Sequence, residues 1–86
     1  MKWTEIQVEY PDKWLVVEAI RFHEEGNVFV ADDLAVVELC QDGAAAFAAY
    51  RRLHRADPTR EFVFAHTSRQ DLRIEERHWI GVRAGA

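Results

Sequence analysis

The sequence has few of the residues that build disulfide scaffolds, membrane spans or phosphate-binding loops. Cys40 is the single cysteine among 86 residues, so no disulfide can form within the chain. No segment approaches the ~20 consecutive apolar residues of a membrane-spanning helix, and the first residues lack the basic start and apolar run of a signal peptide. The four glycines are scattered, which excludes a glycine-rich phosphate loop. We therefore expect a cytoplasmic protein that does not bind a membrane.

The histidines do not form a metal-binding set. His23, His54, His66 and His78 lack the short i, i+2 or i, i+4 spacing that places two ligands on one face of a strand or helix. The chain also has no cysteine pair. We expect neither a bound metal nor a cofactor.

Composition and charge are typical of one globular domain over residues 1–86. Hydrophobic residues make up 49% and charged residues 30% of the chain, the proportions of an ordinary folded domain. The net charge of −4 is unevenly distributed, because residues 1–50 hold three basic and ten acidic side chains, whereas residues 51–86 hold eight basic and five acidic ones. A chain with an acidic and a basic end can dock against its own copy or a partner, although GC-rich coding also yields Arg-rich, Lys-poor chains.

The pattern of apolar residues predicts two strands that form a hairpin. Residues 14–23 carry apolar side chains on both faces, which predicts a central strand covered on both sides, at least in its first half. Residues 28–40 form the second predicted strand, in which Asp32 and Asp33 indicate a bulge or bend. A turn at residues 24–27 joins the two strands as an antiparallel hairpin.

Two helices are expected, one short and one long. Residues 4–10 fit both the alternation of a strand and the stripe of a helix, and we favour a short helix that ends before Pro11. Asp42 is the expected N-cap of a long helix over residues 43–56. That segment is rich in alanine, the best helix former.

The second half of the chain completes an α+β fold with the element order α-β-β-α-β-β. Residues 62–66 form the third predicted strand, and residues 72–83 form the fourth, in which apolar and polar side chains alternate. The crossover through the long helix predicts that the second and third strands are parallel neighbours, and the third and fourth strands form another hairpin. The expected result is a mixed four-stranded sheet with the long helix packed on one face.

The sequence around His66 is the most suggestive candidate for a small-ligand or hydrolytic site. His66 and Ser68 lie where a strand is predicted to end and a loop to begin, a common place for functional residues. Glu18 lies on an apolar face, where a carboxylate needs an Arg or His partner. A Glu18–His66 pair would be the minimum acid–base unit, with Arg69 beside it. The alternatives are a structural Glu18–Arg pair and a histidine packed at the sheet edge.

The last predicted strand carries the candidate binding residues. We expect Trp79 to point outward among charged residues, and an exposed Trp flanked by Arg is typical of an interface anchor. Arg69, Arg73, Arg77 and Trp79 are therefore predicted to contact another protein. The same arginines could also bind nucleic acid, which the pI near 5.5 disfavours. Alternatively, residues 1–10 could fold back and cover Trp79.

Several strings along the chain together resemble a family of short uncharacterised bacterial proteins. They are Tyr10-Pro11-x-x-Trp14, Val17-Glu18-Ala19, Ala49-Tyr50 with Leu53-His54, Phe64-x-His66-Thr67-Ser68-Arg69, Ile74-Glu75-Glu76 and Trp79-x-Gly81-Val82-Arg83. The resemblance covers nearly the whole chain. This family has no assigned activity, and its members are sometimes encoded beside small retropepsin-like aspartic proteases. The resemblance implies the domain boundaries, gives mild support to the N-terminal helix, and suggests at most a companion or partner role.

From these observations we predict a small regulatory or protein-interaction module that forms a homodimer and binds another protein, rather than an enzyme. The first alternative is the small-ligand or hydrolytic site around Glu18, His66, Ser68 and Arg69. The second is nucleic-acid binding through the C-terminal arginines.

Overall fold

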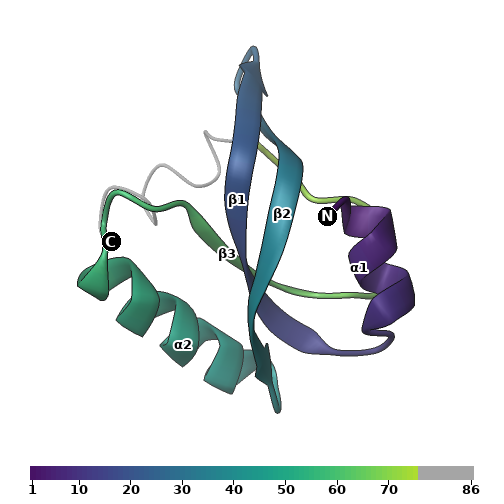
Figure 1. Cartoon of the computed structure of the whole chain (residues 1–86), viewed down its shortest axis with the longest axis vertical. Coiled ribbons are helices and arrows are strands. Elements are labelled where there is room, and N and C mark those ends of the chain that lie inside the picture. Colours follow the sequence, from purple (N-terminus) through teal and green to yellow (C-terminus); the bar gives the residue numbers. More distant parts are fainter. Residues whose placement is uncertain (76–86) are drawn as a thin grey trace.

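The computed structural model describes residues 1–75, which form two helices and an antiparallel sheet (Figure 1). The elements in chain order are α1 (Trp3–Glu9), β1 (Trp14–Glu25), β2 (Val28–Cys40), α2 (Gly43–Ala56), β3 (Phe62–His66) and a short β4 (Arg73–Glu75). The α+β class and the two helices are therefore confirmed. Neither helix is long and apolar enough to cross a lipid bilayer.

The predicted mixed sheet is wrong, because β3 pairs with β1 rather than with β2. The three main strands lie in the order β3-β1-β2, and all their pairings are antiparallel. β2 and β3 run in the same direction, as the crossover through α2 requires, but β1 lies between them. β1 carries apolar side chains on both faces, which suits a strand in the middle of the sheet. The connection through α2 therefore passes across β1 on its way from β2 to β3.

Within residues 1–75, β3 and β4 do not form the hairpin that the sequence predicts. β4 extends the sheet at the opposite edge from β3, where its three residues pair with Val28–Val30 of β2. Of the predicted strand over residues 72–83, the structure describes strand geometry for Arg73–Glu75. The remainder, which includes Arg77 and Trp79, lies outside the described residues.

Both faces of the first half of β1 are covered, as the sequence predicts. On one face, Leu15 and Val17 pack with the buried Trp3 and Ile6 of α1. On the other face, the fully buried Val16 packs against α2 through Ala49 and Tyr50. Figure 1 shows α1 and α2 on different sides of the strands. The structure thus has a second covering helix, where the prediction placed a helix on one face.

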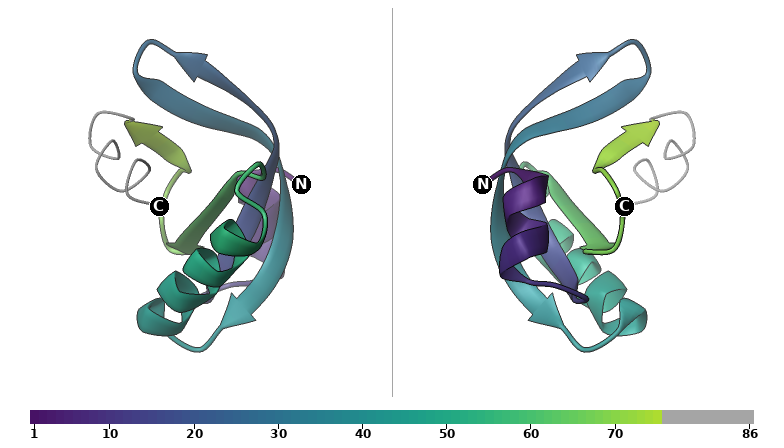
Figure 2. Two further views of the ribbon diagram at one scale, coloured as in Figure 1. Left: turned by 90° about the vertical axis from the view of Figure 1, so that its left-hand side faces the viewer. Right: turned by 90° about the vertical axis from the view of Figure 1, so that its right-hand side faces the viewer.

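The predicted bulge in the second strand is confirmed. Ala19 pairs with Leu34, Arg21 with Asp33 and Phe22 with Ala31, so Ile20 and Asp32 each lack a residue opposite them. These irregularities add local twist, and the outer half of the β1–β2 hairpin bends away from its inner half (Figure 2). A second irregularity, at Val37, lies between the pairs Val16–Glu38 and Val17–Val36.

Side-chain caps stabilise the start of each helix. The Asp42 carboxylate accepts a hydrogen bond of 2.8 Å from the backbone N–H of Ala45, as expected for the N-cap of α2. At the start of α1, the Glu5 carboxylate accepts one of 2.7 Å from the backbone N–H of Lys2. Carboxylates at these positions also favour the positive end of the helix dipole.

Candidate functional site

Glu18 and His66 do not form the acid–base pair that the sequence left open. Both lie on the β1–β3 ladder, but Glu18 is opposite Phe62 and His66 is opposite Trp14. Four residues of strand separate the two positions, which is about 13 Å at ~3.3 Å per residue. A single small substrate therefore cannot receive hydrogen bonds from both groups.

Glu18 instead forms a structural ion pair with Arg60, the alternative considered above. Arg60 lies just before β3 and donates two hydrogen bonds to the Glu18 carboxylate, of 2.9 and 2.6 Å. These bonds lower the pKa of Glu18, against the opposing effect of its burial. The Arg60 guanidinium also lies over the Phe62 ring, 4.9 Å from its centre. The carboxylate is thus held in its charged form by a cation that is itself packed in place.

His66 is hydrogen-bonded at both ring nitrogens. Nδ1 accepts a bond of 3.1 Å from the backbone N–H of Ser68 and lies 2.8 Å from the Ser68 hydroxyl. Because Nδ1 is an acceptor here, the neutral ring carries its proton on Nε2, which lies 3.3 Å from an Asp12 carboxylate oxygen. The ring edge also packs on Trp14 at 5.3 Å. Sequence patterns gave no reason to place Asp12 beside His66, because this contact joins the loop before β1 to the last residue of β3.

The Asp12–His66–Ser68 chain has the order of a hydrolase relay but lacks the enclosure that such a relay needs. The Asp12 side chain is 95% exposed, so water competes for its carboxylate. Ser68 is exposed, and the backbone N–H of Arg69 is bonded to the His66 carbonyl at 3.1 Å. Thr67 exchanges two bonds with Lys13, through its N–H and its hydroxyl. These contacts describe a well-tied turn at the end of β3.

Of the four predicted binding residues, Arg69 and Arg73 lie within the described part of the chain. Arg69 is exposed, and its carbonyl oxygen accepts hydrogen bonds from the Trp3 indole at 2.8 Å and from the Gln7 amide at 2.7 Å. Arg73 lies in β4. The predictions for Arg77 and Trp79 lie outside the described residues, so a shared binding surface stays a prediction.

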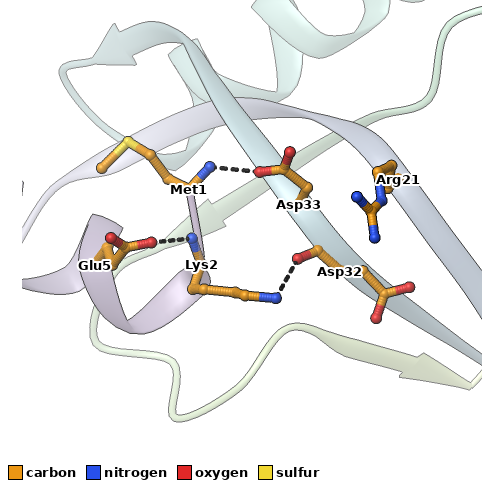
Figure 3. A pocket seen from close by; sticks show the side chains of 6 residues that line it. All are labelled: Met1, Lys2, Glu5, Arg21, Asp32 and Asp33. Carbon is orange, nitrogen blue, oxygen red and sulfur yellow. Dashed lines mark hydrogen bonds and ion pairs between the residues drawn. The ribbon is translucent and has the colours of Figure 1, made fainter.

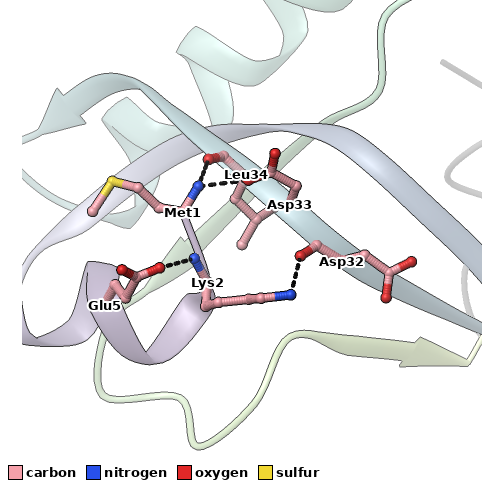
Figure 4. A network of polar contacts seen from close by, with 6 residues as sticks. All are labelled: Met1, Lys2, Glu5, Asp32, Asp33 and Leu34. Carbon is pink, nitrogen blue, oxygen red and sulfur yellow. Dashed lines mark hydrogen bonds and ion pairs between the residues drawn. The ribbon is translucent and has the colours of Figure 1, made fainter.

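The bulge in β2 holds the first residues of the chain (Figures 3 and 4). The Met1 amino group donates to the Asp33 carboxylate and to the Leu34 carbonyl, each at 2.6 Å. The Leu34 N–H donates to the Met1 carbonyl at 2.8 Å, and the Lys2 ammonium donates to the Asp32 carbonyl at 2.9 Å. The bond from the Met1 amino group lowers the pKa of Asp33. The sequence of Asp32 and Asp33 predicted the bulge, but it did not predict that Met1 and Lys2, about 30 residues earlier in the chain, bond to it.

An open hollow of about 280 Å³ lies beside this anchor and is lined by Met1, Lys2, Glu5, Arg21, Asp32 and Asp33 (Figure 3). Its cations and carboxylates are mixed, and several already bond to each other. In residues 1–75, every buried side-chain nitrogen or oxygen has a hydrogen-bond partner. No group of three His, Cys, Asp or Glu side chains in this part could hold a metal ion.

His23 bridges two carboxylates at the outer half of the hairpin. Its Nδ1 lies 2.6 Å from Asp32, and its Nε2 lies 2.8 Å from Glu25. The hydrogen bond to Asp32 makes the largest contribution to a raised pKa of His23, followed by the bond to Glu25. Two acceptors on one ring favour the doubly protonated imidazolium.

Two of the three arginines of α2, Arg51 and Arg52, make local contacts. Arg52 forms an ion pair of 2.5 Å with Glu38 of β2. Arg51 lies over the Phe47 ring, 5.7 Å from its centre. Nothing in this arrangement strengthens the nucleic-acid alternative.

The outer edge of β2, on the side away from β1, is only partly covered. β4 pairs with Val28–Val30, and Met1 bonds to Leu34. Among residues 1–75, no strand pairs with the outer side of residues 35–40, which we call the open β2 edge. Two apolar side chains are exposed there: Val37 is 37% and Leu39 is 52% accessible. The sequence did not predict this open edge, because the expected fold paired the third strand with β2.

Comparisons of the chain with protein-family models, with curated proteins and with solved structures found no match. The resemblance to short bacterial proteins therefore stays a prediction, and the function has to be argued from the geometry.

Proposed function

We propose that this protein is a protein-interaction module that binds an extended polypeptide along the open β2 edge. The observation that carries the proposal is that no strand within the described residues 1–75 pairs with the outer side of residues 35–40, where Val37 and Leu39 are exposed. An unpaired strand edge offers a row of N–H and C=O groups to an incoming strand. Main-chain hydrogen bonds would supply affinity, and the apolar side chains would supply selectivity.

The rest of the β2 edge supports this assignment by contrast. The same strand is shielded over Val28–Val30 by β4 and at Leu34 by Met1. Sheet proteins usually protect an exposed edge with lysine, proline or a covering segment. Residues 35–40 contain no lysine or proline, and no segment of residues 1–75 pairs with their outer side. The charge of Glu38 is paired with Arg52. The bulge at Val37 is the one feature that opposes pairing, and it limits the usable length.

The hydrolytic alternative has no comparable observation behind it. Glu18 is paired with Arg60 and lies far along the ladder from His66. Asp12 and Ser68 are exposed to solvent.

Affinity capture from cells with two matched variants tests the proposal. Leu39→Lys places a charge on the open β2 edge, whereas Val8→Lys places the same charge on the outer side of α1, where Val8 is 83% exposed. We expect a protein that is retained by the wild type and by Val8→Lys and is lost from Leu39→Lys. Identical capture by all three chains would show that binding does not use this edge.

A further inference from the structure

We infer that the outer edge of β3, together with the flank of α2 beside it, binds an acidic polypeptide segment as an added strand. β3 ends the sheet on the side opposite β4, and within residues 1–75 it pairs with β1 alone. This site lies across the sheet from the open β2 edge, so the inference goes beyond the proposed function and can fail while that function stands.

The hydrogen bonds between β1 and β3 show which main-chain groups of β3 face outward. The Thr67 N–H donates to the Lys13 carbonyl, and the Ala19 N–H donates to the Glu61 carbonyl. In an antiparallel ladder, alternate residues of a strand bond to the same neighbour, so the odd-numbered positions of β3 bond to β1. The N–H and C=O groups of its even-numbered residues therefore point to the outer edge.

Phe64 and His66 supply the accessible main-chain groups of this edge. Both residues are partly exposed, whereas Phe62 is only 5% accessible. The His66 carbonyl already accepts a hydrogen bond from the Arg69 N–H. Phe64 therefore offers an N–H and a C=O, and His66 offers an N–H, to an incoming strand.

One flank of α2 stands beside this edge. Phe47, Arg51 and Arg55 are spaced at i, i+4 and i+8, so they lie along one side of the helix. The Phe47 ring packs against the Phe64 ring at 5.5 Å, which places this side next to β3. Phe47 nevertheless stays 43% exposed. A strand added to β3 would lay the side chains of one face against this flank.

The charge of the flank favours an acidic occupant. The sequences of α2 and β3 contain three arginines and two histidines but no carboxylate. Arg52 pairs with Glu38 on the other side of α2. Within residues 1–75, no ion pair involves Arg51 or Arg55, and the Arg51 guanidinium lies over the Phe47 ring at 5.7 Å. Carboxylates of a bound segment would give these two cations their partners.

Carboxylates near both ends of β3 fix where the acidic residues of the segment lie. Asp12 lies 3.3 Å from the Nε2 atom of His66 at the end of the strand, and Glu61 precedes its first residue. Like charges repel, so the acidic residues of the segment belong opposite the middle of β3, beside Arg51.

A polypeptide fits this edge better than a nucleic acid does. The main-chain donors and acceptors of an edge strand match those of another strand. The net charge of the chain is −4, whereas nucleic-acid-binding domains are usually basic. Because β3 has only five residues, the complex should be weak, and its ion pairs should make it sensitive to salt.

Selection from a peptide library tests this inference. Random peptides of about eight residues, long enough for one strand, are captured on the purified full chain. We expect the retained peptides to be rich in aspartate and glutamate and to bind more weakly as the salt concentration rises. Retained peptides without this acidic preference overturn the inference.

Matched variants then locate the bound peptide. Arg51→Gln should weaken the binding of a retained peptide by about fivefold, the effect of one exposed ion pair. Val8→Glu changes the net charge by the same amount on the outer side of α1 and should leave binding unchanged. Circular dichroism establishes that each variant is folded. Equal binding by wild type and Arg51→Gln overturns the inference. Loss of binding in Leu39→Lys alone would also overturn it, because the peptide would then occupy the open β2 edge of the proposed function.

N-methylation of the peptide tests strand addition. Only alternate N–H groups of an added strand bond to β3, so methylating one alternate set should abolish binding, and methylating the other set should not. Equal effects of the two sets overturn strand addition. Two further results would assign the flank to another occupant and overturn the inference. One is binding of single-stranded RNA that is lost in Arg51→Gln, and the other is a dimer of the chain alone, seen in sedimentation, that is lost in the same variant.

Discussion

The indole N–H of Trp3 donates a hydrogen bond of 2.8 Å to the backbone carbonyl of Arg69, across 66 residues of sequence. This bond joins α1 to the loop that follows β3. Gln7 donates to the same carbonyl, and also to that of Thr67. One helix of seven residues therefore closes the face of β1 opposite α2 and fixes the exit of β3.

Replacing Trp3 with phenylalanine tests how much this bond stabilises the fold. Trp3→Phe keeps an aromatic ring in the core but removes the donor, while Gln7 still satisfies the Arg69 carbonyl. We expect a loss of about 1–2 kcal/mol in the free energy of unfolding, measured by urea denaturation. Thr4→Ser, at an exposed site on α1, should change it by less than ~0.5 kcal/mol. A fully stable Trp3→Phe variant would show that α1 is held by other contacts.

The Glu18–Arg60 pair predicts a loss of stability in acid. Arg60 lowers the pKa of Glu18 below its ordinary value of 4.5. The pair is therefore fully stabilising above pH 4.5, and its contribution falls as the pH drops through the lower pKa of the folded state. Arg60 is half exposed, so a double-mutant cycle with Glu18→Gln and Arg60→Gln should give a coupling of about 0.5–1 kcal/mol at pH 7. The coupling should vanish at low pH, and one that persists there would contradict the ion pair.

The contacts of His23 predict that stability falls as the pH rises near neutrality, which is the opposite direction to the effect of the Glu18–Arg60 pair. Asp32 and Glu25 raise the pKa of His23 above its ordinary value of 6.5. Its contribution to stability is therefore complete below pH 6.5 and disappears as the pH rises through the higher pKa of the folded state. Titration of the His23 ring by NMR measures the shift directly. Asp32→Asn should bring the pKa of His23 closer to 6.5, and an unchanged pKa would remove Asp32 as its cause.

Local features of the fold were predictable because their causes lie within a few residues. Asp42 caps α2 through a backbone N–H three positions ahead. Asp32 and Asp33 cannot both fit a regular, half-buried strand, and the bulge follows. The contacts of the candidate site could not be predicted in the same way from nearby residues. Glu18 was expected to find a cation, but the identity of Arg60 depended on the way β3 meets β1.

The sequence by itself determined the helices, the β1–β2 hairpin and the coverage of both faces of β1, because apolar periodicity and turn chemistry act over short distances. Only the tertiary structure decided that β3 lies beside β1 and that Met1 and β4 occupy parts of the β2 edge. It also decided that no strand within residues 1–75 pairs with the outer side of residues 35–40. Strand order depends on which apolar faces can be buried together across the whole chain. No local pattern contains that information.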